Sequence, residues 1–551
     1  MTSLQHFEEQ KFLGPLAPAV RRRLKEFDAE DVVSRIWSHD HTVWKPDPTE
    51  ITNRLGWLTL ATDLRSRIPE LQAFAKRVAA DGFTHAVLLG MGGSSLAPEM
   101  FARTYAEPHR RAELKSEEPH RRAELQGPTA KGALELTVLD TTHPATIARV
   151  EASLDLDHTL FIVASKSGTT LETLSQFEYF SAKTGGRGSS FIAITDPGTP
   201  LEELARARGF RHVFQNPPDL GGRYSALSLF GLVPAALIGA DLEDLLFSAE
   251  EMADGCKAVP AFENPGAWLG ALLGEATLAG QDKLTFVLPA SVASFGDWVE
   301  QLVAESTGKE GKGIVPVPGE DIGPPDVYGD DRLFVSLGDY PGLAPLREAG
   351  YPVVTLEFGG PNTLGSEIFR FEFATAVAGH VLGINAFDQP NVEEAKQVTR
   401  AILASQQERS RLEETYPGDA AGELQGVAPG DYIAIQAYLD RTPETAAALQ
   451  LDRLALRGTH RAATTVGFGP RFLHSTGQLH KGGPPTGVFL QVSDEGREVD
   501  LPIPGKPYTF GTLIDAQALG DLQALRARRR RVARVSFGEL ERLARSNGGT
   551  R

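Results

Sequence analysis

The sequence has little cysteine and little positive charge, and each shortage excludes a class of protein. Cys256 is the single cysteine among 551 residues, which excludes an intramolecular disulfide and a cysteine-rich metal site and fits a reducing cytoplasm. The 72 Asp and Glu outnumber the 55 Lys and Arg, and the resulting net charge of −17 argues against a nucleic-acid or acidic-membrane surface. An anionic ligand must therefore be held by a local positive site.

Targeting and membrane-spanning patterns are also lacking. The first residues show no basic-then-apolar signal pattern. The longest apolar stretch, 226–240, is interrupted by Ser228 and Pro234 and is too short to span a bilayer. We therefore expect a cytoplasmic protein without a membrane partner, in which 226–240 forms a buried helix.

The length and the turn-forming residues predict a globular protein of more than one unit. A chain of 551 residues exceeds one ordinary hydrophobic core, and 56 Gly, 36 Pro and 41% hydrophobic residues are typical of a globular fold with many turns. We expect a helical segment over 1–47, a first domain over 48–240 and a second domain over 241–551.

Apolar strand-like runs alternate with helix-like segments, which predicts mainly parallel sheets flanked by helices, an α/β fold. In the first domain the expected strands are 85–89, 134–139, 159–164, 191–195 and 212–215. In the second they are 283–288, 332–337, 353–358, 432–439, 462–468, 487–492 and 531–537. Ligands of such sheets bind outside the carboxyl ends of the strands.

A turn rich in donors follows the expected strand 159–164. Five of its six residues have donor side chains: Ser165, Lys166, Ser167, Thr169 and Thr170. The free N–H groups of a helix start and the hydroxyl donors make a site for a phosphate dianion. The alternative is plain capping of the following helix, but one cap needs fewer donors.

A second glycine-rich turn, 90–95, follows the expected strand 85–89. It differs from a dinucleotide fingerprint because Ser95 stands where the third glycine is needed. The amides of Gly92 and Gly93 can approach a ligand closely, so a sugar or phosphate loop that includes Ser94 fits better, and a purely structural turn is the alternative. Both turns end strands of one sheet, so they can share a pocket.

Three stretches together, 165–170, 90–94 and 301–309, resemble glucose-6-phosphate isomerase, in particular the isomerase half of fused transaldolase/phosphoglucose isomerase proteins. The resemblance runs from about residue 35 to near the C-terminus. It implies two sugar isomerase (SIS) domains, the second completed by the C-terminal segment. It further implies a glycolytic and gluconeogenic enzyme that interconverts glucose 6-phosphate and fructose 6-phosphate. No cofactor or metal is needed, because only protons move.

The resemblance also implies the catalytic residues. Glu305 corresponds to the base that moves the substrate proton, and Gln301 shares its helix face. Arg223, within a Gly-Gly-Arg-Tyr-Ser segment, is expected to stabilise the enediolate. Lys396 ends a segment, 385–396, whose final lysine assists ring opening. The ordinary alternatives are a solvated glutamate, a structural ion pair for Arg223, and an exposed lysine paired with Glu393.

The ring-opening histidine departs from the family pattern. Residues 314–346, where it is expected, contain no histidine, whereas His474, Gln478 and Gly483 reproduce the family spacing near the C-terminus. We therefore expect His474 to open the ring from a strand–helix piece that was relocated in sequence but kept its place in space. His480 is the alternative, and either could be a structural histidine. A metal site is not expected, because the two are six residues apart without an adjoining acid.

Two other functions and several properties stay open. A bifunctional isomerase that also accepts mannose 6-phosphate is one alternative, and a non-catalytic SIS regulator that binds sugar phosphates is another. Glu305 argues against a pure binding protein. Homodimerisation and a functional association with transaldolase are left open. Residues 107–114 recur as 118–125, which we interpret as a tandem duplication in a charged connection.

Overall fold

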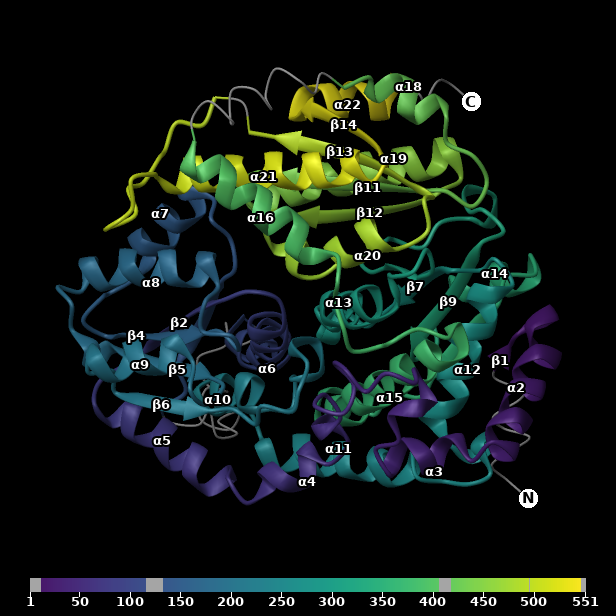
Figure 1. Cartoon of the computed structure of the whole chain (residues 1–551), viewed down its shortest axis with the longest axis horizontal. Helices are drawn as coiled ribbons and strands as arrows, with labels where there is room; N and C mark the ends of the chain where they lie inside the picture. The colour runs from purple at the N-terminus through teal and green to yellow at the C-terminus, as the bar shows by residue number, and fades with distance from the viewer. Residues whose placement is uncertain (1–10, 115–131, 406–417, 495, 547–551) are drawn as a thin grey trace.

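The computed structural model describes residues 11–114, 132–405, 418–494 and 496–546. The strands of these residues form three sheets, which lie at the left, right and top of Figure 1. The α/β class expected from the sequence is confirmed, because the strands pair in parallel with a single antiparallel exception among the described residues.

The first sheet has the order β3-β2-β4-β5-β6. Its strands are β2 (His85–Gly90), β3 (Glu135–Leu139), β4 (Thr159–Ala164), β5 (Phe191–Thr195) and β6 (His212–Gln215). Successive side chains of a strand point to opposite faces of this sheet, and each face packs in its own hydrophobic core. Ile162 lies in one core and Phe161 in the other, so both faces of the sheet are covered. One face packs on α5 (Ile68–Ala80), α6 (Leu96–Leu114) and α10 (Leu229–Leu237). The other packs on α7 (Pro144–Ser153), α8 (Leu171–Lys183) and α9 (Pro200–Ala207).

The second sheet has the order β1-β10-β9-β7-β8, with β1 antiparallel. Its strands are β1 (Lys11–Phe12), β7 (Lys283–Val287), β8 (Val315–Val317), β9 (Arg332–Leu337) and β10 (Val353–Leu356). Its helices are α11 (Leu242–Gly255), α12 (Pro265–Leu278), α13 (Phe295–Thr307), α14 (Leu343–Glu348) and α15 (Leu364–Leu382). The N-terminal helices are α2 (Ala17–Ala29), α3 (Val32–Trp37) and α4 (Leu60–Arg65). One hydrophobic core joins these helices, except α14, to the first sheet.

The C-terminal strands form a third sheet, so the expectation that this segment completes the second sheet is wrong. The order is β12-β11-β13-β14, from β11 (Tyr432–Tyr438), β12 (Ala463–Phe468), β13 (Gly487–Ser493) and β14 (Arg531–Ser536). The edge strand β8 contains Pro316, which has no N–H for a further ladder. The side chains of Val315 and Val317 pack instead with Ala434 and Ala463 of the third sheet.

The third sheet is also covered on both faces. The helices α18 (Ala420–Gln425), α19 (Pro443–His460) and α22 (Phe537–Ser546) cover one face. On the other lie α20 (Gly477–Gly482) and α21 (Phe510–Ala527), and α16 (Val392–Ala404) packs along α21. The third sheet and these helices lie above α13 in Figure 1.

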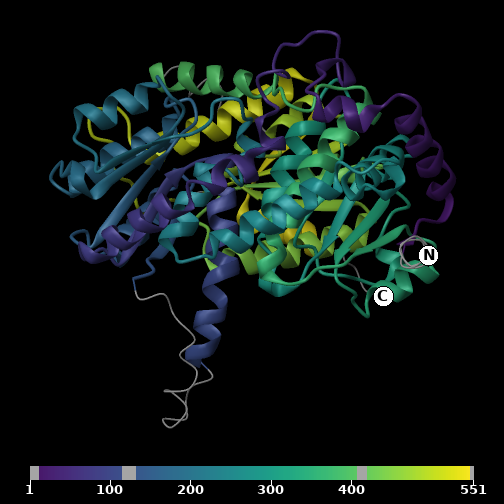
Figure 2. The ribbon, with the colours of Figure 1, turned by 90° about the horizontal axis from the view of Figure 1, so that it is seen from below.

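The strands predicted from the sequence all occur, with ends that differ by at most two residues; β1 and β8 were missed. The expected buried helix within 226–240 is α10, whose residues are all buried. The first copy of the duplicated stretch ends α6, which projects from the body in Figure 2, so it is helical rather than a connection. The second copy, 118–125, lies outside the described residues. The boundaries at 48 and 241 stay predictions.

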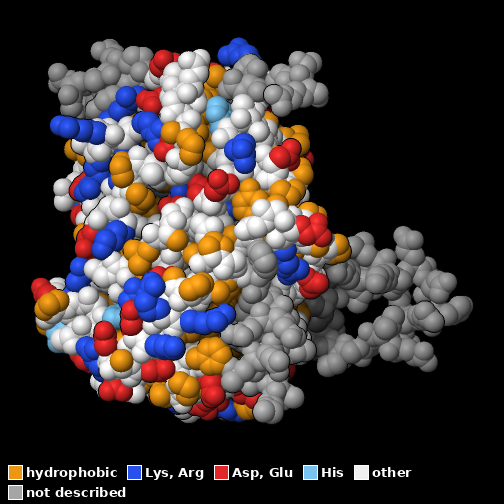
Figure 3. Space-filling model, turned by 90° about the vertical axis from the view of Figure 1, so that its right-hand side faces the viewer, with side chains coloured by type: hydrophobic (Ala, Val, Ile, Leu, Met, Phe, Trp, Pro, Cys, Tyr) orange, Lys and Arg blue, Asp and Glu red, His pale blue; other side chains and the backbone are white. Residues whose placement is uncertain are grey.

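The surface and the helices agree with the composition. In the face drawn in Figure 3, basic, acidic and hydrophobic side chains are interspersed. Among the described helices, none combines the length and the apolar character that crossing a bilayer requires.

Candidate active site

The glycine loop after β2 lies against three other segments. Gly92, in the 3-10 turn Gly92–Ser94, has a φ of +54°, and a Cβ there would lie 2.8 Å from the carbonyl oxygen of His474 and 2.9 Å from Nε2 of Gln301. A Cβ on Gly93 would lie 2.0 Å from the carbonyl oxygen of Gly222. The two glycines therefore permit a close approach that no other residue allows. Ser94 beside them is buried.

Glu305 on α13 is buried rather than solvated, with 5% of its surface exposed. Its Oε2 lies 3.7 Å from Nη1 of Arg223 and accepts a hydrogen bond of 3.1 Å from Nε2 of Gln301. Burial raises the pKa of this carboxyl, while the charges of Arg223, His474 and Lys309 oppose the rise. A carboxylate of raised pKa is a stronger base than an exposed one, as general base catalysis requires.

Arg223 is held so that one nitrogen faces Glu305. Nε donates to Oγ of Ser306 at 2.6 Å, and Nη2 donates to the carbonyl oxygens of Ala386 at 2.7 Å and Asp388 at 3.0 Å. Nη1 is the nitrogen nearest the glutamate. A guanidinium fixed by three hydrogen bonds is preorganised to stabilise a negative charge.

Lys309 adds a second buried cation, a feature that the sequence analysis missed. Its Nζ lies 2.6 Å from both the carbonyl oxygen and Oδ1 of Asp388. Burial, together with the charge of Arg223, lowers the pKa of Lys309 to about 8. This lysine ends the stretch 301–309 that carries the family resemblance, so the signal was present in the sequence.

His474 comes from the C-terminal segment and lies beside α13. Its carbonyl oxygen accepts a hydrogen bond of 2.8 Å from Nε2 of Gln301, the amide that also contacts Glu305. Its ring Nε2 lies 2.9 Å from Oε1 of Glu172, which also accepts a 2.7 Å hydrogen bond from Gln517. The structure thus brings the histidine and the predicted base into one region.

Glu172 is the other residue that the sequence analysis missed. Burial alone would raise the pKa of its carboxyl, but the imidazole of His474 and the charge of Lys396 contribute to a lowered pKa. A carboxylate hydrogen-bonded to the imidazole orients the ring of His474. Glu172 stands two residues after the donor-rich turn, in the first turn of α8, where a negative charge is also stabilised.

His480 and Lys396 lie in different surroundings. His480 is buried on α20 between aromatic rings of Tyr432, Phe472 and Phe489, and Nδ1 contacts Gln436 at 3.2 Å. Burial lowers its pKa well below the usual value. This is the environment of a structural histidine.

Lys396 on α16 is exposed, and its Nζ lies 3.9 Å from Oε2 of Glu393. The ion pair that was the alternative interpretation is therefore present. The charge of Lys396 is also the smallest of the contributions that lower the pKa of Glu172.

The donor-rich turn joins β4 to α8. Oγ of Ser165 lies 2.8 Å from Oγ1 of Thr170, and Oγ of Ser167 lies 3.0 Å from Oγ1 of Thr169. Thr170 occupies the N-cap of α8 without a side-chain capping bond, so plain capping does not explain these hydroxyls. Lys166 donates instead to the carboxylate of Asp196 and, at 3.3 Å, to the carbonyl oxygen of Pro218.

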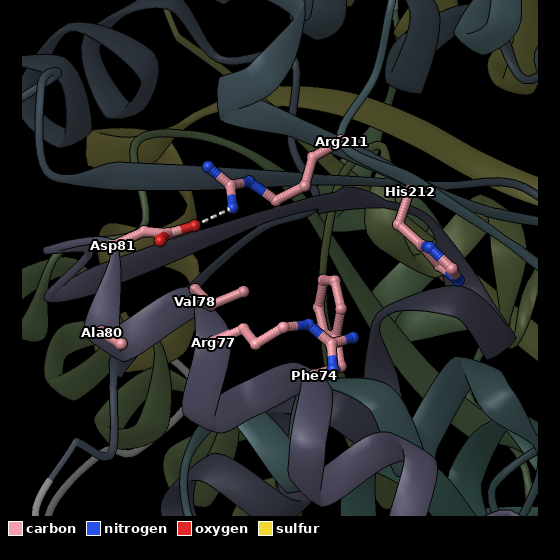
Figure 4. Close-up of a pocket in the computed structure, with 7 residues that line it drawn as sticks. All are labelled: Phe74, Arg77, Val78, Ala80, Asp81, Arg211 and His212. Atoms are coloured by element: carbon pink, nitrogen blue, oxygen red, sulfur yellow. Dashed lines mark hydrogen bonds and ion pairs between the residues drawn. The ribbon is translucent and has the colours of Figure 1, made fainter.

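A cavity of about 300 Å³ lies at the amino end of β6, away from these residues (Figure 4). Arg77 lies over the ring of Phe74, and Arg211 is paired with Asp81. The carbonyl end of α5 and the carboxylate of Asp81 weaken the positive potential of the two arginines. None of the residues predicted for the site lines this cavity.

Comparisons with known proteins agree with the fold and with the motifs. The family described as phosphoglucose isomerase matches residues 63–314. A glucose-6-phosphate isomerase of Carboxydothermus hydrogenoformans is 30% identical over 63% of this chain and 85% of its own length. That of Thermosynechococcus vestitus is 28% identical over 82% of this chain and 89% of its own length.

Solved structures extend the comparison. A hypothetical protein of Thermus thermophilus is 25% identical with a TM-score of 0.57, over 70% of this chain and 98% of its own. A glucose-6-phosphate isomerase from Chlamydia trachomatis shares the fold at 18% identity with a TM-score of 0.55, over 70% of this chain and 86% of its own. The sequence relatives, above all the 30% identity across most of the Carboxydothermus protein, show that the chain belongs to the glucose-6-phosphate isomerase family.

Proposed function

We propose that this chain interconverts glucose 6-phosphate and fructose 6-phosphate by proton transfer through an enediol. The observation that carries the proposal is Glu305, a buried carboxylate of raised pKa that lies 3.7 Å from the guanidinium of Arg223. A protein that only binds sugar phosphates has no need of a buried base opposite a fixed cation. The family relatives named glucose-6-phosphate isomerase support the same substrate pair.

The substrate phosphate rests on the donor-rich turn, which we call the phosphate cradle: Ser165, Lys166, Ser167, Thr169 and Thr170. Its hydroxyls exchange their mutual hydrogen bonds for bonds to the phosphate oxygens. The glycine loop, with Gly92, Gly93 and Ser94, faces the sugar. Gln301 holds both the base and the His474 segment.

The reaction then has two stages, ring opening and isomerisation. His474, oriented by Glu172 and assisted by Lys396, protonates the ring oxygen as its bond to carbon 1 breaks. Water takes the proton of the hydroxyl on carbon 1, which becomes the open-chain carbonyl. In the open chain of glucose 6-phosphate, Glu305 then takes the proton from carbon 2 and returns it to carbon 1, while the hydroxyl proton passes from the oxygen on carbon 2 to the oxygen on carbon 1. Arg223 stabilises the negative charge of the enediolate between these steps.

The cellular setting belongs to the same proposal. We place the protein in a reducing cytoplasm because its single cysteine, Cys256, is buried and unpaired. Homodimerisation and a functional association with transaldolase are tested by measuring the mass of the purified chain in solution, with and without a transaldolase.

A coupled assay tests the activity directly. Purified chain is given fructose 6-phosphate, and glucose 6-phosphate formation is followed through its dehydrogenase, with mannose 6-phosphate as a second substrate. In Glu305→Gln the turnover should fall by roughly 10²–10⁴-fold, the range for a positioned acid–base group. The exposed Glu310, paired with Lys45, provides the control Glu310→Gln, which should be unchanged.

One outcome would contradict the activity, one would contradict the assignment of the base, and one would widen the substrate range. Phosphate binding without turnover would indicate a sugar-phosphate regulator. Turnover that survives in Glu305→Gln would assign the base elsewhere. Equal rates with mannose 6-phosphate would indicate the bifunctional enzyme.

A further inference from the structure

A buried cluster of charges lies next to the candidate site and has no part in the proton transfers. At its centre is Arg471, whose side chain is 11% exposed. Its Nη1 contacts the carboxylate of Glu99 and, at 2.8 Å, Oδ2 of Asp140, while Nη2 lies 3.3 Å from Oδ2 of Asp297. Glu99 and Asp140 are as buried as the arginine, with side chains 10% and 8% exposed.

The three carboxylates come from different parts of the fold. Glu99 is on α6, Asp140 follows β3, and Asp297 is in the first turn of α13, the helix that carries the predicted base. Arg471 begins the 3-10 turn Arg471–His474, so it stands three residues before the histidine. One guanidinium thus connects the start of this turn to the first sheet's unit, through Glu99 and Asp140, and to α13, through Asp297.

The cluster also reaches the glycine loop. Oγ of Ser95 donates to Oδ2 of Asp140 at 3.3 Å and to the carbonyl oxygen of Gly92 at 3.1 Å. Gly92 in turn lies against the backbone of His474. The charges and the loop therefore hold the histidine segment from two sides.

Such a connection is needed because the strand ladders do not supply one. In the described residues, the third sheet forms no ladder with the other two sheets. Other polar contacts between the third sheet's segment and the first unit lie at several elements. Arg149 to Asp440 and His143 to Asp494 lie within α7 and just before it, Arg441 lies 3.5 Å from Glu99 on α6, and Gln517 donates to Glu172 on α8. None of these contacts involves the first residues of the turn that ends at His474, whereas His474 itself is bound by Gln301 and Glu172.

We propose that Arg471 is a positioning residue, which holds His474 beside Gln301 by binding Glu99 and Asp140 of the first α/β unit. The inference rests on the proposed function and adds a residue that acts through the histidine rather than on the substrate. Charge-assisted hydrogen bonds between buried partners are strong and directional, which suits a fixed spacer. A shift of about 1 Å in a catalytic group can cost about 10²-fold in rate.

The test must separate position from stability, since removal of Arg471 leaves buried carboxylates uncompensated. The main variant is therefore Arg471→Met with Asp140→Asn, which removes one charge of each sign. Arg471→Lys keeps the charge but has a single nitrogen, so it cannot reach Asp297 as Nη2 does while it binds Glu99 and Asp140. Arg103→Met is the matched control, because Arg103 contacts Glu99 at 2.7 Å but is 58% exposed.

Ring opening is measured apart from isomerisation by NMR exchange between the α and β anomers of glucose 6-phosphate. This exchange needs the ring to open and close but not the proton transfer at carbon 2. We expect the double variant to lose about 10²-fold in anomer exchange and in kcat. Its Michaelis constant and its inhibition by inorganic phosphate should stay unchanged, and Arg471→Lys should recover part of the rate.

Two results would overturn the inference on Arg471 but not the proposed function. In the first, the wild type is active and the folded double variant keeps its anomer exchange. In the second, Arg103→Met loses as much anomer exchange as the double variant. If the double variant does not fold, an unchanged anomer exchange in Arg471→Lys also overturns it. A wild type that neither opens the ring nor isomerises the sugar overturns the proposed function as well, so the two failures can be told apart.

Discussion

The close approach of Gly93 to Gly222 can be tested by substituting alanine for each glycine in turn and comparing the two variants. In Gly93→Ala the new methyl group is placed 2.0 Å from the carbonyl oxygen of Gly222, whereas the Cβ of Gly222→Ala meets no atom within 4 Å. Neither glycine has a left-handed φ, so conformational strain does not distinguish the two substitutions. The difference between them is steric.

The size of the effect follows from the distance. Ordinary contact of a Cβ begins at 3.4 Å, so the two backbones must separate by about 1.4 Å in Gly93→Ala. Overpacking of this kind costs about 1–3 kcal/mol of stability. Because Gly222 precedes Arg223, the separation also moves the guanidinium away from Glu305, and a shift of this size should reduce kcat by about 10²-fold.

Both variants are purified and compared with the wild type by thermal unfolding and by the coupled assay with fructose 6-phosphate. Gly93→Ala should unfold at a lower temperature and lose most of its turnover, whereas Gly222→Ala should resemble the wild type in both. A fully active Gly93→Ala, or a Gly222→Ala as damaged as its counterpart, would refute the steric argument and the close approach of the two loops.

Two further predictions concern charge and the phosphate cradle. Lys309→Met removes a cation that opposes the raised pKa of Glu305, so the base stays protonated to a higher pH and the acid limb of kcat/KM should shift upward; the same limb in the exposed control Lys312→Met should not move. Ser165→Ala and Thr170→Ala each remove a donor to a charged ligand worth about 1.5–3 kcal/mol, so the Michaelis constant and the inhibition constant of inorganic phosphate should rise together. Unchanged inhibition would place the phosphate elsewhere.

The sequence predicted the strands well because most are apolar runs bounded by glycine-rich turns. It missed β8, where Val315 and Val317 flank a proline and the run is only three residues long. It also assigned the C-terminal strands to the wrong sheet. A strand's apolar pattern shows that it is buried but not which strand it pairs with, and the proline at the edge of the second sheet was not taken into account.

The candidate site was predictable where a local motif carried it. Glu305, Arg223 and the cradle residues stand in recognisable stretches, and the prediction of His474 rested on its spacing to Gln478 and Gly483. Arg471 has no such signal, because its partners are hundreds of residues away in sequence and its neighbours form no motif. The role of Glu172 was equally hidden, since only the fold brings its carboxylate to the histidine ring.

The candidate active site is assembled from residues that are far apart along the chain. His474 and Glu172 are 302 residues apart, and Gln517 and Glu172 are 345 apart. The chain loses conformational entropy when such distant residues are brought together. Their contacts offset this loss only when the folded units on either side have formed. Activity should therefore appear last as the chain folds and disappear first as it unfolds. A partly folded molecule with an intact first sheet should therefore have no turnover, so that turnover measures how much of the protein is completely folded.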